Sequence, residues 1–354
     1  MQFGVLLPTR PRYLDMVPAI EAAGYERVWF QDFQLAGADS FVEMAIRAAS
    51  APRLGFGVAV CNPITRDVTV VANTMATLNR HYPGRMELGV AVGEAPLRAI
   101  GHRRATVDEL ERFVRRCRAL MRGESTEVSD ESGPVRFLDS ALPALNLEDP
   151  IPIRIGAGGP KSLRLAGAVA DGVILGNIDP RLLAIQLGYL REGAEAAGRS
   201  LAEIDVAVLA GVFAAEPEPS FELLRHHVGG FVPNFLTSNA AAVEGHEDEL
   251  SPALVTAFRT VAGLRKQAAA SAQAATGRKS AVYERYLESV PAHLGAVVNG
   301  ETIAAKVLFG ATSEVDRRLA ELRDLGVNTV ILFPDPLDDG ALATFASRHL
   351  AAAQ

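Results

Sequence analysis

The chain has 354 residues, of which 49% are hydrophobic, so it can bury one large α/β core or the cores of two small domains. Its 42 Asp and Glu residues outnumber 35 Lys and Arg residues, and the net charge of −7 disfavours a nucleic-acid partner. Because Cys61 and Cys117 lack metal-ligand spacing and no signal peptide or membrane-spanning run is present, we expect a cytoplasmic protein without a metal site.

Strands and helices alternate over the first part of the chain. The strands are apolar throughout, which is typical of a parallel sheet covered on both faces. One helix begins with a capping box, because Glu109 follows Thr106 by three residues. We predict strands at 3–7, 27–30, 54–60, 86–92, 151–155, 172–175 and 206–212, and helices at 14–23, 41–49, 68–79, from 106 onward, 162–170 and 181–197.

Two segments interrupt this alternation. Residues 122–150 are polar and contain Pro and Gly, which predicts a loop-like insertion. Residues 214–310 contain no clear strand and instead predict helices at about 220–228, 251–272 and 279–288. The alternation resumes with a helix at 313–325, a strand at 329–333 and a last helix at about 340–352.

Eight consecutive strand–helix units favour a (β/α)8 TIM barrel formed by residues 1–354 as a single domain. The insertion at 214–310 then follows strand seven, and it would form a wall or lid at the carboxyl ends of the strands. An open, doubly wound parallel sheet is the alternative, because periodicity does not show whether a sheet closes.

Polar residues and glycines follow four of the predicted strands. Asp32 comes after the second strand, Asn62 after the third, Glu94 after the fourth and the pair Gly158-Gly159 after the fifth. Ligands of parallel α/β proteins bind beyond the carboxyl ends of the strands. We therefore expect these residues to form the floor of one active site.

Each of these residues also has a structural explanation. Glu94 could act as a general acid in an apolar cleft, or it could pair with Arg98 one helical turn away. Gly158-Gly159 could admit a phosphate to the backbone amides at a helix start, or form a simple turn with Ser162 as N-cap. Asp32 could contact a cofactor or cap its own loop.

Three sequence runs resemble a known family. They are NPITRDVTVVANTMATLNRHYPGRMELGVAVGEA, PIRIGAGGPKSLRLAGAVADGVILGN and the weaker match SEVDRRLAELRDLGVNTVILF. They resemble the luciferase-like flavin and deazaflavin oxidoreductases, especially the branch that uses coenzyme F420. That branch includes methylenetetrahydromethanopterin reductase and F420-dependent glucose-6-phosphate dehydrogenase. The resemblance covers nearly the whole barrel but not the insertion at 214–310.

The resemblance implies roles for particular residues. A non-prolyl cis peptide between Ala59 and Val60 would support the deazaflavin ring, and Asn62 would lie close to that ring. Gly158 and Gly159 would receive the cofactor phosphate. The expected catalytic residues are Glu94, as proton donor or acceptor, and Asp32. The residues expected to contact the cofactor are Asp32, Ala59, Val60, Cys61, Asn62, Gly93, Ala157, Gly158 and Gly159.

The sequence departs from its relatives at two positions. Phe33 stands where the glucose-6-phosphate dehydrogenases carry His, which disfavours glucose 6-phosphate as substrate. Glu94 stands where the pterin reductases usually carry Asp, which disfavours methylenetetrahydromethanopterin. The substrate pocket is expected within the insertion. Phe231, Phe235, His226 and His227 either line that pocket or form a packed core of their own.

The resemblance implies an F420-dependent oxidoreductase that transfers a hydride between C5 of the reduced deazaflavin and a C=N, C=C or C=O group of a small molecule. The alternatives are an FMN-dependent monooxygenase and a non-catalytic ligand-binding barrel. The Asn62-Pro63 bulge and the turn at 83–85 favour F420 over FMN. Relatives are often homodimers that associate through helices near strands two to four, and we expect the same here.

Overall fold

Eight parallel strands form a closed barrel, because β8 pairs with β9 and thereby completes the ring. The computed structural model describes residues 1–128, 133–213, 219–277, 290, 292–335, 337–338 and 340–350. The (β/α)8 prediction is confirmed, and the open sheet is excluded. In ring order the strands are β1 Gln2–Leu7, β2 Arg27–Phe30, β3 Gly55–Cys61, β4 Met86–Val90, β7 Ile153–Ala157, β8 Gly172–Leu175, β9 Asp205–Val212 and β11 Thr329–Phe333.

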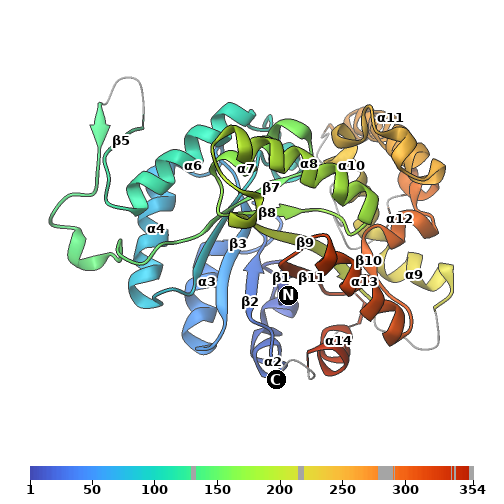
Figure 1. The fold of residues 1–354 in the computed structure, drawn as a ribbon, viewed down its shortest axis with the longest axis horizontal. Helices are drawn as coiled ribbons and strands as arrows, with labels where there is room; N and C mark the ends of the chain where they lie inside the picture. The colour runs from blue at the N-terminus through green and yellow to red at the C-terminus, as the bar shows by residue number, and fades with distance from the viewer. Residues whose placement is uncertain are drawn as a thin grey trace.

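Helices surround the barrel (Figure 1), and their buried side chains form one outer cluster with those of the strands. The predicted helix at 14–23 is wrong as a single element, since two short helices replace it. The capping box of Thr106 and Glu109 is confirmed at the start of α6. The surrounding helices are α1 Pro11–Leu14, α2 Val17–Ala22, α3 Ser40–Ser50, α4 Val68–His81, α5 Glu94–Ala99, α6 Val107–Met121, α7 Pro160–Val169, α8 Pro180–Ala196, α13 Thr312–Asp324 and α14 Ala341–His349.

The two faces of each strand carry different residues. Val28 and Phe30 of β2 pack outward with the helices, whereas Trp29 packs with the cluster inside the barrel. This alternation follows from the two-residue repeat of a strand. Both faces are buried, so most strand residues are apolar, and exceptions such as Glu87 and Arg154 lie near the amino ends of their strands.

A buried charge network fills the amino-terminal end of the barrel. Oε1 of Glu87 accepts hydrogen bonds from Nε of Arg154 at 2.6 Å and Nε1 of Trp29 at 2.8 Å. Nη1 of Arg154 also donates to Oδ1 of Asp205 at 2.8 Å, and Arg27 approaches Glu87 at 3.7 Å. The interior at this end is therefore filled by protein, and the carboxyl-terminal mouth is the end available for a ligand.

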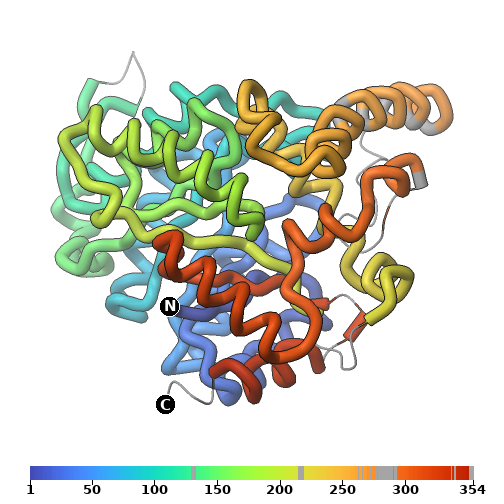
Figure 2. The backbone as a smooth tube through the Cα atoms, turned by 45° about the vertical axis from the view of Figure 1, so that its right-hand side comes forward, coloured from blue at the N-terminus to red at the C-terminus, as the bar shows by residue number. Residues whose placement is uncertain are grey.

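The insertion lies at one end of the molecule, as α9 to α12 show in Figure 1. The predicted helix at 220–228 is confirmed as α9, and that at 251–272 as α11, which extends outward in Figure 2. The predicted helix at 279–288 lies outside the described residues. Two helices were missed, α10 and α12. The insertion helices are α9 Phe221–Val228, α10 Val232–Val243, α11 Pro252–Thr276 and α12 Gly300–Ala304.

The insertion, predicted to hold no clear strand followed by a helix, contains one short strand near its end. There β10 Val307–Leu308 pairs with Gly211 and Val212 of β9. Two residues are too few to produce a recognisable strand pattern. Lys306, just before β10, is buried, and its Nζ donates a hydrogen bond to the carbonyl of Leu209 on β9.

The segment 122–150 projects from the other end of the molecule, around β5 in Figure 1. Most of its described residues form loops, as predicted, but β5 Thr126–Glu127 and β6 Pro134–Val135 make a small antiparallel pair. Among the described residues, no helix combines the length and apolar character needed to cross a bilayer.

Candidate active site

The centre of the site is a kink in β3 at the mouth of the barrel. The Ala59–Val60 peptide bond is cis, as the family resemblance implied. The pairing of β3 with β4 shifts register between Val58 and Cys61, which is a bulge. Val60 lies inside the barrel, because a Cβ placed on Gly89 or Gly156 would come within 3.2 or 3.3 Å of its methyl groups. Ala59 and Val60 are only partly buried, so they form an accessible shelf.

Asn62 is fully buried directly after this bulge. Its Oδ1 accepts hydrogen bonds from the amides of Ile64 and Thr65, each at 3.0 Å, which fixes the loop. Its Nδ2 has no partner, and neither has Oγ1 of Thr65. Gln34, in the loop after β2, is the third described residue with a buried side-chain atom lacking a partner.

These three unpartnered atoms show whether the residues at the site fit a cofactor. Buried polar groups are nearly always hydrogen-bonded, and each exception requires a cause. Here the exceptions lie in the loops after two adjacent strands, β2 and β3, and Asn62 and Thr65 closely follow the β3 bulge in sequence. A planar heterocycle with carbonyl and N–H groups would supply the missing partners, so the residues fit a flavin or deazaflavin.

Gly93 provides room beside Asn62. Its φ of 74° lies in the left-handed region, and a Cβ there would come within 3.0 Å of Cγ of Asn62 and 2.7 Å of Leu97. Both the backbone conformation and the close contact therefore require glycine. The residue begins α5, a helix that the sequence patterns did not reveal.

Glu94 forms ion pairs at the edge of the site. Its carboxylate accepts from Nε of Arg98, and Nη1 of Arg104 lies 3.5 Å away. The side chain is 27% exposed rather than enclosed in an apolar cleft. The structure thus agrees with the expected Arg98 pair, while a catalytic role for Glu94 stays a prediction.

Asp32 is buried and held by a partner that the sequence did not suggest. Nε and Nη2 of Arg66 donate to its two carboxylate oxygens at 2.9 and 2.7 Å, and Oγ of Ser40 donates at 2.8 Å. Arg66 also contacts Asp39 at 2.9 Å and stacks on the ring of Phe41. This fixed geometry suits a charged anchor for a ligand better than a group that transfers protons.

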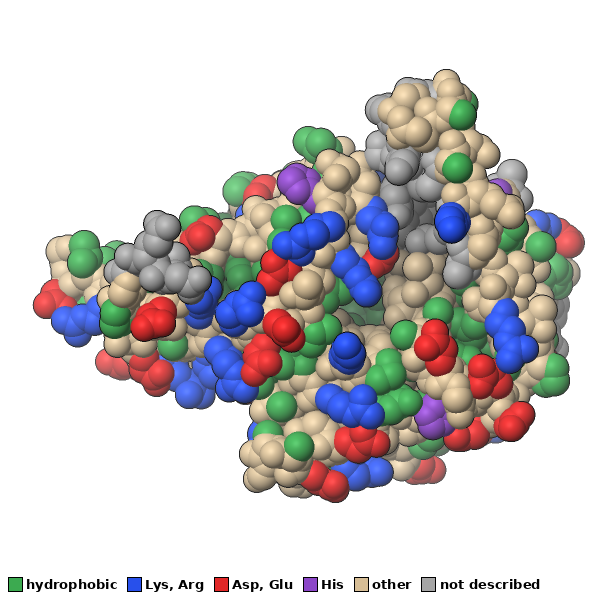
Figure 3. All heavy atoms as spheres, turned by 90° about the horizontal axis from the view of Figure 1, so that it is seen from above, with side chains coloured by type: hydrophobic (Ala, Val, Ile, Leu, Met, Phe, Trp, Pro, Cys, Tyr) green, Lys and Arg blue, Asp and Glu red, His purple; other side chains and the backbone are tan. Residues whose placement is uncertain are grey.

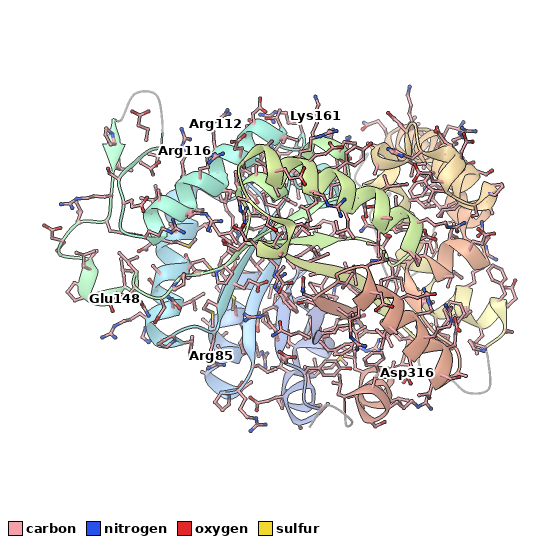
Figure 4. All side chains as sticks on the ribbon, in the orientation of Figure 1. Arg85, Arg112, Arg116, Glu148, Lys161 and Asp316 are labelled. Carbon is pink, nitrogen blue, oxygen red and sulfur yellow. The ribbon has the colours of Figure 1, made fainter. Side chains whose placement is uncertain are left out.

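The glycine loop after β7 leads into α7. Gly159 is the N-cap and has no side chain to cap the first amides. Ser162 as N-cap is therefore wrong, since its hydroxyl donates to the carbonyl of Gly159 instead. Lys161 projects outward from the edge of the molecule, as do Arg112 and Arg116 (Figure 4). Figure 3, which views that edge, shows Lys and Arg side chains mixed with Asp and Glu.

Gly158 lies directly beneath α10 of the insertion. A Cβ on this residue would come within 2.1 Å of the carbonyl oxygen of Ser238. The side chain of Gln186 joins the two segments, because its Nε2 donates to the carbonyl of Gly158 and to Oδ1 of Asn239. Oε1 of Gln186 accepts from Asn177 at 2.7 Å. The requirement for glycine at 158 thus arises from contact with the insertion.

Two other predicted site residues have side chains that point away from the site. Cys61 and Ala157 are buried in the outer cluster, so only their backbone faces the site. Burial raises the pKa of the Cys61 thiol, which opposes a role as nucleophile.

Arg85 lies at the amino end of β4 and donates to the carbonyls of Leu54 and Ala48. The turn at 83–85 therefore stabilises the barrel at the end away from the site.

The insertion residues divide into two groups. Phe231 and Phe235 are fully buried in the inner cluster, so they are core residues. His226 is exposed, whereas His227 is half-buried and pairs with Asp335, which the sequence analysis did not select. Asp335 follows β11 by two residues, so the rule that selected Asp32 would also have found it.

Comparison with known proteins identifies related sequences. A family model described as luciferase-like monooxygenase matches residues 1–329. The 5,10-methylenetetrahydromethanopterin reductase of Methanolobus tindarius is 30% identical over 215 residues, 59% of this chain and 64% of that protein. The F420-dependent glucose-6-phosphate dehydrogenase of Nakamurella multipartita is 34% identical over 208 residues, 54% of this chain and 60% of that protein. The matched part therefore spans just under two thirds of these relatives.

Solved structures share the complete fold. The coenzyme F420-dependent tetrahydromethanopterin reductase from Methanopyrus kandleri has a TM-score of 0.66 at 20% identity, covering 100% of this chain and 99% of that one. The monooxygenase RslO1 from Streptomyces bottropensis has a TM-score of 0.63 at 18% identity, covering 100% of both chains. At such identities the likeness concerns the fold alone.

Proposed function

Because the chain belongs to the luciferase-like monooxygenase family, we propose that it is a coenzyme F420-dependent oxidoreductase that transfers a hydride between C5 of the reduced deazaflavin and a small organic substrate. The observation that carries the proposal is the set of unpartnered buried polar atoms in the loops after β2 and β3, beside the bulge between Val58 and Cys61. The names of the relatives in M. tindarius and N. multipartita support F420 over FMN.

Several residues of this chain would hold the cofactor. Nδ2 of Asn62 would donate to a ring carbonyl, and the absence of a side chain at Gly93 leaves room beside it. Arg66, fixed by Asp32, would anchor one edge of the ring. The uncapped amides at the start of α7 would bind a phosphate. Coenzyme F420, when bound, supplies a carbon that accepts or releases a hydride.

Titration of the purified protein with F420 and, separately, with FMN tests this proposal. We expect F420 to quench or shift fluorescence in a saturable way and to bind at least roughly tenfold more tightly than FMN, a difference of about 1.4 kcal/mol. Tight FMN binding with oxygen consumption would replace the proposal by the monooxygenase alternative. Binding of neither would favour a non-catalytic barrel.

The variant Asn62→Asp tests the bulge directly. The substitution keeps an oxygen that accepts from Ile64 and Thr65 but removes the buried donor. We expect the Kd for F420 to rise by at least roughly tenfold, because the lost hydrogen bond contributes about 1.4 kcal/mol and a buried carboxylate would also repel a ring carbonyl. Asn73→Asp, on the exposed face of α4, is the matched control and should leave the Kd unchanged. Equal affinity of the two variants would remove Asn62 from the site.

We also propose that two copies associate through α3 and α4. Four apolar side chains on α3, on α4 and in the loop before α3 are each more than half exposed, and we take them as one interaction surface. Family resemblance supports a second copy as the occupant. The residues are Leu35, Val42, Ile46 and Val70.

Light scattering after gel filtration tests the association. The unmodified protein should have the mass of a dimer, and Val42→Asp/Ile46→Asp should have the mass of a monomer, because two buried carboxylates would oppose association. Leu138→Asp, at an exposed apolar residue of the 122–150 segment, should remain dimeric. A monomeric unmodified protein would refute the proposal.

A further inference from the structure

A histidine and a buried carboxylate meet above the barrel. Nδ1 of His227, on α9, donates to Oδ2 of Asp335 at 2.7 Å. The other oxygen of Asp335 accepts from the amide of Leu337 at 2.8 Å. The Asp335 side chain is completely buried, whereas that of His227 is 20% exposed. Burial raises the pKa of Asp335, and the bond from His227 opposes this effect.

The pair lies on the same face of the barrel as the cis bulge. Asp335 follows the carboxyl end of β11, and Phe213, whose ring meets the edge of His227 at 5.0 Å, follows the carboxyl end of β9. Phe213 belongs to the inner cluster against which Ala59 and Val60 also pack. In ring order β3 and β4 lie across the mouth from β9 and β11. A molecule on the shelf would thus be bounded by His227 on the far side.

The arrangement differs from the other histidine–carboxylate pairs of the described residues. His246 contacts Glu249, and His349 contacts Asp316, and in both pairs the carboxylate is more than half exposed. At His227, by contrast, the carboxylate is fully buried and the imidazole is partly exposed. An acceptor held at Nδ1 fixes the tautomer and leaves Nε2 as the position for proton exchange.

We propose that Nε2 of His227 exchanges a proton with the substrate oxygen and that the substrate is therefore a ketone or the corresponding secondary alcohol. Asp335 is the positioning residue that holds the ring. This inference rests on the proposed F420-dependent function and selects the C=O group among the substrate classes considered above.

The step is balanced in atoms and electrons. In the reductive direction the carbonyl carbon accepts a hydride with its electron pair, and the π pair of the C=O bond moves onto oxygen. Nε2 of the protonated imidazole gives that oxygen its proton, which leaves a secondary alcohol and a neutral imidazole. His227 then regains a proton from solvent. In the oxidative direction, neutral Nε2 removes the hydroxyl proton as the hydride leaves.

Chemical modification tests the location without relying on activity. Diethyl pyrocarbonate would be applied to the protein with and without F420, and each modified histidine would be quantified by peptide mass spectrometry. His227 should react in the free protein and be protected roughly threefold or more by F420. His81, the exposed last residue of α4, should react equally in both samples. Unchanged reactivity of His227 when F420 binds would overturn the inference.

Hydride transfer tests the chemistry. Oxidation of reduced F420 would be followed with acetone and cyclohexanone as probe ketones. His227→Gln should lower kcat by roughly 100-fold with the Kd for F420 unchanged, and Asp335→Asn should lower kcat and alter its pH profile. His81→Gln is the control and should retain full activity. The Asp335→Asn pH profile distinguishes a positioning role from a merely structural one.

The outcomes separate the two proposals. F420 binding without reduction of either ketone, or retention of kcat within threefold by His227→Gln, would refute the histidine role and leave the F420-dependent function intact. Failure of F420 to bind at all would refute both.

Discussion

Glu87→Leu is expected to lower the free energy of unfolding by about 3–5 kcal/mol, because removal of one partner from a buried ion network leaves charges without compensation. The carboxylate of Glu87 is the acceptor for Arg154 and Trp29 inside the barrel. Without it, the guanidinium of Arg154 keeps Asp205 as a partner but loses its shorter contact, and Arg27 loses its nearest acid.

Chemical denaturation of the two proteins would measure this difference. The control is Glu111→Leu, because Glu111 pairs with Arg115 at 2.8 Å on the exposed side of α6. An exposed pair of this kind contributes about 0.3–0.5 kcal/mol. If the free energy of unfolding fell by less than about 1 kcal/mol in both variants, the interior network would not stabilise the barrel as the geometry implies.

Lys306→Met is expected to stabilise the protein, and the gain should be largest at or below neutral pH. Burial lowers the pKa of Lys306 to about 7, because the ammonium group loses its hydration. Unfolding restores a pKa near 10.4. Between these values the unfolded chain binds more protons than the folded one, so the stability of the unmodified protein rises with pH.

The sign and size of the stability change follow from the difference between the two pKa values of Lys306. Below pH 7 the lysine is charged in both states, and the penalty for burying the charge is fully present. It is lost as the pH rises towards the unfolded value. The difference between a pKa of about 7 and one near 10.4 corresponds to roughly 4–5 kcal/mol as an upper limit, and loss of the hydrogen bond to Leu209 offsets about 1–2 kcal/mol. We therefore expect a net gain of about 2 kcal/mol near pH 6 that vanishes or reverses near pH 10.

Denaturant unfolding of both proteins at pH 6, 8 and 10 would measure the trend. Lys266→Met, on the exposed face of α11, is the matched control and should show no dependence on pH. A difference between Lys306→Met and the unmodified protein that stayed constant over this range would contradict the burial of a neutral amine.

The sequence allowed the barrel to be predicted because each strand is a mainly apolar run of four to eight residues, and strands and helices alternate along most of the chain. Elements defined by tertiary contact escaped this reasoning. The two-residue strand β10 exists only because it pairs with β9, and α5 is a short helix that follows the left-handed Gly93. Closure of the ring rests on the β8–β9 pair, which no local pattern encodes.

At the candidate site, too, some residues could be predicted from the sequence and others are brought together only by the fold. Asp32 and Asn62 could be selected because they follow strands, and the cis bond at Ala59–Val60 was located by resemblance. Their partners could not be selected, because Arg66 reaches Asp32 across 34 positions of the chain. His227 and Asp335 are 108 positions apart, and the fold alone brings them together.

The contact between Gly158 and α10 constrains how the sequence of this protein can evolve. The loop that would receive the cofactor phosphate and the segment that would recognise the substrate share a backbone contact and the amide of Gln186. A substitution that shifts α10 therefore also moves the loop beneath it. Exchange of the insertion between relatives, as a route to new substrates, would alter cofactor affinity at the same time, and both properties would have to be selected together.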